Sequence, residues 1–211
     1  MEKVIDNIIL LHAVLGGIAL LSGAIALSTK KGSATHKKAG RWFYNAMLSS
    51  IVISLIVAWM PGHENMFLFG IGIFSLYFIL SGYRALRYLK PNFSIQVDQF
   101  IAWAIIAVGL CMIVLPILLE SKINIILSVF GGVGMVFGIR DLLLLRDTTK
   151  LRKIAIKQHL GKMTGGYIAA VSAFFVVNNI LPGMWNWFAP SIIGTIFITY
   201  WMNKMDRKKS F

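Results

Sequence analysis

The sequence predicts an all-α membrane protein with seven transmembrane helices. The 211-residue chain is 57% hydrophobic and only 14% charged, with a mean hydropathy of +0.75. A soluble domain carries about 25% charged residues. The apolar residues gather in long runs, and the Lys and Arg residues lie in alternate connections between them. The runs leave no room for a sizeable soluble domain, so residues 1–211 are expected to form a single membrane domain.

Each apolar run is long enough to be one transmembrane element. A helix needs about 17–25 residues to cross roughly 30 Å of hydrocarbon. Helices are expected because lipid offers no partner for backbone groups, which must therefore be satisfied within each segment. The seven runs cover residues 8–28, 42–60, 66–83, 99–119, 123–139, 163–181 and 188–203.

The basic residues predict the orientation of these helices. With seven crossings, 19 of the 21 Lys and Arg residues fall on one face, and only Lys3 and Lys122 fall on the other. Cytoplasmic loops carry such an excess, so the N-terminus is expected outside and the C-terminus in the cytoplasm. These loops are expected to meet anionic lipid headgroups, so the net charge of +13 requires no nucleic-acid partner. The sequence does not indicate an oligomeric state.

Three sequence matches, in the same order in both halves, predict an internal duplication. Each recurs at an offset of 115 to 123 residues: VLGGIALLSG with VFGGVGMVFG, H-x7-Y-x-A-x2-S at His36 and His159, and P-G-x2-N-x-F at Pro61 and Pro182. We therefore expect a 3+1+3 arrangement of two parallel three-helix repeats, as in some transporters. The repeats would cover 8–88 and 123–205, with a linker helix at 97–119.

Glycines recur on one face of the first and fifth predicted helices. Gly16 and Gly23 are seven residues apart, as are Gly131 and Gly138. Small residues allow helix backbones to approach closely in lipid. The pattern predicts helix packing rather than ligand contact.

The segments HLGKMTGGYIAAVSAFFVVNN, THKKAGRWFYNAM and GIRD resemble a domain-of-unknown-function family of small bacterial membrane proteins. The similarity covers most of the chain. It implies an integral protein of the bacterial cytoplasmic membrane, in which the two histidines and the Asp after the fifth run are shared features. The family supplies no established substrate or reaction.

Polar residues at the cytoplasmic ends of the predicted helices form the candidate site. His36 and His159 occupy equivalent points of the repeat, and each is followed by a tyrosine eight residues later. Ionisable residues in or near a membrane span are by default candidates for function. We expect Asp141 to pair with Arg140, Arg41 or His159. The candidate residues are His36, His159, Asp141, Arg140, Tyr44, Tyr167 and Asp98.

The same residues leave open whether the protein binds a cofactor. His36, His159 and Asp141 offer two nitrogens and a carboxylate to a divalent metal, and paired histidines are typical of membrane haem proteins. Both histidines lie roughly 6–9 Å outside the apolar runs, which counts against haem. The alternative is that each histidine bonds free backbone groups at the start of its helix. No nucleophile motif is present, so no catalytic residue is assigned and an enzyme is not favoured.

The leading functional prediction is a small transporter or permeation protein. Its pathway would run between the two repeats, with polar residues at the cytoplasmic mouth. Almost no charge is available at mid-membrane, which favours a proton or a neutral or apolar small molecule. A redox or metal-binding protein and a lipid-binding or assembly protein remain the alternatives.

Overall fold

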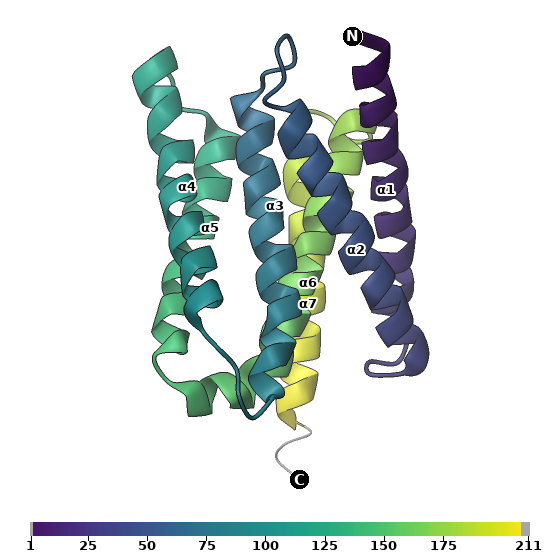
Figure 1. Cartoon of the computed structure of the whole chain (residues 1–211), viewed down its shortest axis with the longest axis vertical. Coiled ribbons are helices and arrows are strands. Elements are labelled where there is room, and N and C mark those ends of the chain that lie inside the picture. The colour runs from purple at the N-terminus through teal and green to yellow at the C-terminus, as the bar shows by residue number, and fades with distance from the viewer. Residues whose placement is uncertain (1, 208–211) are drawn as a thin grey trace.

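The computed structural model of the chain describes residues 2–207. Lys208 and Lys209, which belong to the basic C-terminal tail, lie outside this range. The described residues form helices and no strands (Figure 1). The elements are α1 (Glu2–Ser28), α2 (Ala34–Val57), α3 (Met66–Arg84), the 3-10 helix η1 (Ala85–Leu89), α4 (Gln96–Glu120), α5 (Ile125–Leu145), α6 (Thr148–Asn178) and α7 (Trp185–Arg207).

The helices run up and down in a bundle with α3 and α6 at its centre. On one side of this central pair, α1 lies along α2, and on the other side α4 lies along α5 (Figure 1). The last helix, α7, packs against α6. The polar residues described below lie where α3, α4, α5 and α6 meet.

Four helices begin at a side chain that caps the backbone. The side chains of Ser33, Asn65, Asn124 and Asp147 accept hydrogen bonds from backbone N–H groups in the first turns of α2, α3, α5 and α6. Ser, Asn and Asp are favoured at this position because they satisfy a donor that has no partner within the helix. The cap of α2 is therefore Ser33 and not the side chain of His36.

Two helices extend well beyond the apolar runs from which they were predicted. Helix α2 begins at Ala34 rather than near 42, and α6 begins at Thr148 rather than near 163. The charged turns continue the helix because hydropathy marks only the lipid-buried part of a helix, whereas caps mark its ends. The interpretation of His159 as a residue at a helix start is therefore wrong, since it lies well inside α6.

Six of the seven α-helices in residues 2–207 are long and apolar enough to cross a membrane, as judged by length and composition. The exception is α7, whose crossing stays a prediction. Large apolar side chains point outward on several helices, including Leu21, Val136 and Ile193, which are between 64 and 71% exposed. Such extensive apolar exposure suits lipid rather than water. These features are those of an integral membrane protein.

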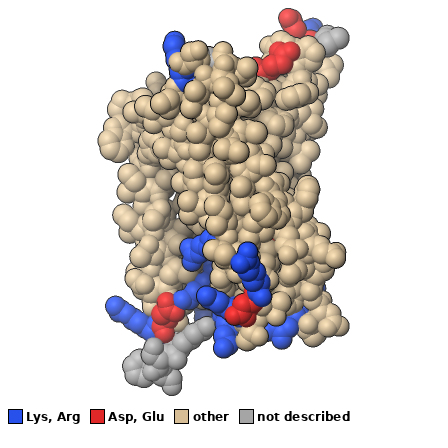
Figure 2. Space-filling model, turned by 90° about the vertical axis from the view of Figure 1, so that its left-hand side faces the viewer, with Lys and Arg blue, Asp and Glu red and all other residues tan. Residues whose placement is uncertain are grey.

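The charged residues are concentrated at the two ends of the molecule. On the face drawn in Figure 2, most Lys and Arg side chains gather at the lower end, others lie at the upper end, and the middle of the surface carries none. The loops between α1 and α2, between α3 and α4, and between α5 and α6 all lie at this lower end (Figure 1). We call it the basic end.

The two predicted repeats do not pack in the same way. Helix α1 packs mainly on α2, whereas α5, its expected counterpart, packs mainly on α4. The matched asparagines also differ, because Asn65 caps α3 while Asn186 bonds back to both backbone groups of Leu181. The predicted linker helix corresponds to α4 and is an integral part of the bundle. The duplication itself stays a prediction.

Candidate functional site

Two buried charged residues and a buried tyrosine form a three-residue cluster near the basic end of the bundle. Asp141 of α5 accepts a hydrogen bond of 2.7 Å from the hydroxyl of Tyr77 of α3. The ammonium of Lys162, on α6, donates to the same carboxylate oxygen and forms an ion pair with it. The three residues are 9, 3 and 5% exposed, respectively. We call them the Asp141 cluster.

A second buried ion pair lies beside this cluster. Arg84, at the end of α3, donates from Nε and from one terminal nitrogen to the two carboxylate oxygens of Asp98, at 2.8 and 2.7 Å. Asp98 lies in the first turn of α4 and is 6% exposed. This two-point geometry is the strongest that Arg and a carboxylate make, and it holds the start of α4 against α3.

The carboxylates of both ion pairs, together with Lys162, line one small, partly enclosed cavity. Its volume is about 10 Å³, and Asp98, Asp141 and Lys162 line it together with Ser81, Tyr88 and Gln158. A polar cavity needs about 10–15 Å³ of this kind to hold one water. Within the described residues, no buried side-chain nitrogen or oxygen lacks a hydrogen-bond partner. The arrangement is therefore a small, partly enclosed chamber with polar and apolar walls and room for about one water.

The local sequence of α5 explains why Asp141 is buried and its neighbour is not. Gly131, Gly134 and Gly138 lie on the face of α5 that packs against α4, and Asp141 continues that face one turn further. Arg140, about 100° around the helix, is exposed. Arg140 was one predicted partner of Asp141, and the structure instead pairs Asp141 with Lys162.

Lys162 is one of the site residues that sequence reasoning missed, with Tyr77 and Arg84. In the sequence, Lys162 is one of the 19 basic residues expected on the cytoplasmic face. The buried face of α6 gives a signal that could have identified it, because Ala155, Lys162 and Ala169 are seven residues apart. A lysine on a face of small buried residues needs a partner, since an unpaired buried charge is costly.

The two predicted histidines make equivalent hydrogen bonds, each to a backbone carbonyl of a neighbouring helix. The Nδ1–H of His36 donates to the carbonyl of Ala26 in α1, and that of His159 donates to the carbonyl of Gly82 in α3, both at 2.9 Å. The two imidazoles are close enough to interact electrostatically. Each therefore fastens the basic end of its helix to a neighbouring helix, and neither bonds to Asp141.

The two predicted tyrosines belong to the apolar packing around α2. Tyr44 stacks on Tyr83 with ring centroids 4.0 Å apart, and Tyr167 meets the edge of Phe43 at 5.9 Å. Both rings pack against the hydrophobic cluster between α2, α3 and α6. Of the seven predicted residues, only Asp141 and Asp98 line the chamber.

The metal candidates are not assembled into a ligand set. Across residues 2–207, no three His, Cys, Asp or Glu side chains come together in a way that could hold a metal ion. His36 and His159 each use Nδ1 on a backbone carbonyl, and Asp141 is bonded to Lys162 and Tyr77.

The fold and this site define a polytopic helical membrane protein with a buried charged chamber near its basic end. No known protein family, no curated protein and no solved structure matches the chain. The resemblance to a family of small bacterial membrane proteins therefore stays an expectation.

Proposed function

We propose that the protein is a small membrane transporter or permeation protein in which the Asp141 cluster handles a proton. The observation that supports this most directly is the burial of a carboxylate, an ammonium and a phenol against one another within helices suited to cross lipid. Ionisable groups in such positions are costly and mark proton or substrate pathways in membrane proteins. The cargo that fits is a proton alone or a neutral or apolar small molecule moved with one.

The residues around Asp141 suit a carboxylate that can give up its ion pair with Lys162 when it binds a proton. Tyr77 of α3 and Lys162 of α6 both bond its Oδ2. Asp98 of α4 with Arg84 of α3, and Tyr88 of η1, lie around the same chamber, while Arg140 flanks Asp141 in the chain. When Asp141 takes up a proton, the ion pair with Lys162 is lost. The contact between α5 and α6 would loosen, which is a physical route from protonation to opening.

The proposed orientation places the basic end in the cytoplasm, with the N-terminus outside. Among residues 2–207, 17 of the 19 Lys and Arg residues lie in the loops at that end or in the helix halves that adjoin them. In this proposal α7 is the seventh span. Its 23 residues are long enough for a crossing at 1.5 Å per residue, and Lys204 and Arg207 fall in its last turn.

Proton flux into liposomes tests the function. The purified full chain would be reconstituted with a pH-sensitive dye inside, and a potassium gradient with valinomycin would set the potential. We expect the wild type to acidify the interior and Asp141→Asn to behave like protein-free liposomes, because an amide takes up no proton. Arg140→Gln, exposed and adjacent in the chain, is the matched control and should keep the wild-type flux. A wild type without flux would contradict transport of the proton alone, and an active Asp141→Asn would contradict the role of Asp141.

A further inference from the structure

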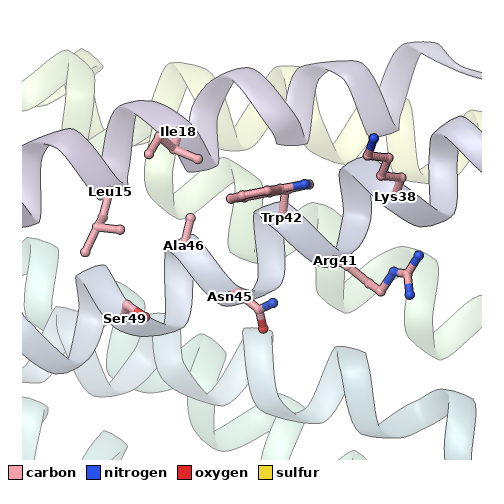
Figure 3. A pocket seen from close by; sticks show the side chains of 8 residues that line it. All are labelled: Leu15, Ile18, Lys38, Arg41, Trp42, Asn45, Ala46 and Ser49. Carbon is pink, nitrogen blue, oxygen red and sulfur yellow. The ribbon is translucent and has the colours of Figure 1, made fainter.

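A lateral groove on the outer face of the α1–α2 pair is not used by the site described above. Its larger part has a volume of about 470 Å³ (Figure 3). Two residues of α1 and six of α2 line it: Leu15, Ile18, Lys38, Arg41, Trp42, Asn45, Ala46 and Ser49. A second hollow of about 370 Å³ shares Ile18, Lys38 and Trp42 with it and continues toward the basic end at Ile25 and Thr35.

The lining changes in character along the groove. In Figure 3, the side chains of Lys38 and Arg41 lie at one end, and Leu15 and Ser49 lie at the other. The indole of Trp42, which is 58% exposed, lies between them. No Asp or Glu lines either hollow. The groove therefore has a cationic end and an apolar body.

The dimensions match one leaflet of a membrane. Lys38 and Ser49 are eleven residues apart in α2, which is about 16 Å along a helix. Half of a hydrocarbon core of roughly 30 Å is about 15 Å. Leu15 is near the middle of α1, so the deep end of the groove lies at about mid-membrane.

The depths of Lys38, Arg41, Trp42 and Asn45 also agree with those of the parts of a bound phospholipid. Trp side chains are enriched where headgroups meet hydrocarbon, and Trp42 follows Arg41 directly at that level. Both Lys38 and Arg41 are exposed. Asn45, one turn deeper than Arg41, is at the level expected for glycerol ester groups. Guanidinium and ammonium groups together recognise a phosphate through charge-assisted hydrogen bonds.

We propose that this groove binds one anionic phospholipid of the leaflet at the basic end. Lys38 and Arg41 hold its phosphate, Trp42 packs against its glycerol region, and one acyl chain lies along Leu15, Ile18 and Ala46. The positive charge selects an anionic headgroup over a zwitterionic one. The proposal depends on the α1–α2 face alone and does not require that the protein transports anything.

Native mass spectrometry of the purified full chain in detergent tests this lipid site. The probes are dioleoyl-phosphatidylglycerol and dioleoyl-phosphatidylcholine, titrated separately. Each basic residue near a phosphate contributes about five-fold in affinity, so Lys38→Gln/Arg41→Gln is expected to weaken phosphatidylglycerol binding about 25-fold. The control is Lys150→Gln/Lys204→Gln, which removes two exposed charges from the same end but outside the groove. It should bind phosphatidylglycerol as the wild type does.

A second measurement locates the acyl chain. Phosphatidylglycerol with brominated acyl chains should quench tryptophan fluorescence of the wild type, and the quenching should fall in Trp42→Phe. Equal binding of the two lipids by the wild type would overturn the proposal, as would equal weakening in the groove variant and in the control. Quenching that is unchanged in Trp42→Phe would overturn the placement of the chain along Trp42.

Discussion

Each member of the Asp141 cluster makes the burial of the others tolerable. A buried ion loses its hydration and is stabilised only by its partners. The ammonium of Lys162 lies 5.1 Å from the centre of the Tyr77 ring in addition to its pairing with Asp141, so all three side chains stabilise one another. Removing one member is therefore expected to lower the unfolding free energy by more than the intact ion pair contributes to it.

A double-mutant cycle tests this dependence. Lys162→Met leaves the carboxylate of Asp141 without its counter-charge and should lower the unfolding free energy by about 3–5 kcal/mol. The double variant Lys162→Met/Asp141→Asn should recover part of this loss, because the amide oxygen of Asn can still accept from Tyr77. Thermal unfolding in detergent would measure the four proteins of the cycle.

The control for that cycle is Lys157→Met in the same helix. Lys157 pairs with Asp206, whose side chain is 59% exposed. Such surface pairs contribute roughly 0–1 kcal/mol, so this variant should unfold close to the wild type. Equal losses in Lys157→Met and Lys162→Met would show that the buried pair has no special contribution.

The cluster could be predicted only in part from the sequence. Asp98 and Asp141 stand out because acidic residues are rare in this chain and both adjoin apolar runs. Lys162 and Arg84 did not stand out, since each belongs to a basic stretch that topology already explains. Tyr77 lies inside an apolar run, where a tyrosine carries no polar signal. Partner choice depends on which faces meet, and one sequence does not contain that information.

At the scale of elements, glycines determine how closely α4 and α5 pack. A methyl group added at Gly131 would lie 2.6 Å from the carbonyl oxygen of Gly109, and one added at Gly109 would lie 2.6 Å from that of Gly131. The two backbones are therefore in direct contact at this point. Such close approach is available only to small residues and is a main source of helix association in lipid.

Neighbouring glycines provide a matched test of this contact. Gly131→Ala should lower the unfolding temperature, because a backbone atom cannot move aside as a flexible side chain can. Gly132→Ala should leave it unchanged or raise it slightly, since nothing lies within 4 Å of an added methyl group there and Ala is the better helix former. Thermal unfolding in one detergent would compare them. Equal effects of the two substitutions would mean that the close contact does not contribute to stability.

The helices themselves were largely predictable, and their ends were not. The apolar run 99–119 lies within α4, Gln96–Glu120, because nearly the whole helix is apolar. The run 163–181 shows only the later part of α6, Thr148–Asn178, because its first half is basic. The cap residue Asp147 marks the true beginning of α6, which hydropathy alone does not reveal.

At the scale of the whole molecule, the faces that the helices present decide which helices pack together, and their order along the chain does not. The predicted repeat pairs the fifth helix with the sixth, as the first pairs with the second. In the structure, α5 turns its glycine face to α4, which supplies Gly109 and Ala102 at the points of closest contact. The α3–α6 pair then occupies the centre, fastened by the bond from His159 to Gly82. Matching faces on helices far apart in sequence were beyond sequence reasoning.

The orientation of the bundle gives a prediction that covers all of its helices. Single cysteines would be placed in a Cys111→Ala background at exposed positions of both ends. His63 and Met184 precede α3 and α7 at one end, whereas Asn92 and Asn203 lie at the basic end. With the basic end in the cytoplasm, a membrane-impermeant maleimide should label His63→Cys and Met184→Cys in intact cells. It should label Asn92→Cys and Asn203→Cys only after permeabilisation, because positive loops are retained inside.

The labelling of Met184→Cys and Asn203→Cys, near the two ends of α7, decides whether that helix crosses the membrane. Met184 and Asn203 are separated by 19 residues, or roughly 28 Å of helix, which is close to the hydrocarbon thickness. Labelling of both from the same side would mean that α7 lies along the surface and that six spans are present. Labelling of Asn92→Cys and Asn203→Cys from outside, with His63→Cys and Met184→Cys protected, would mean that the bundle is inverted. The proposed cytoplasmic location of the Asp141 cluster and of the lipid groove would then be reversed with it.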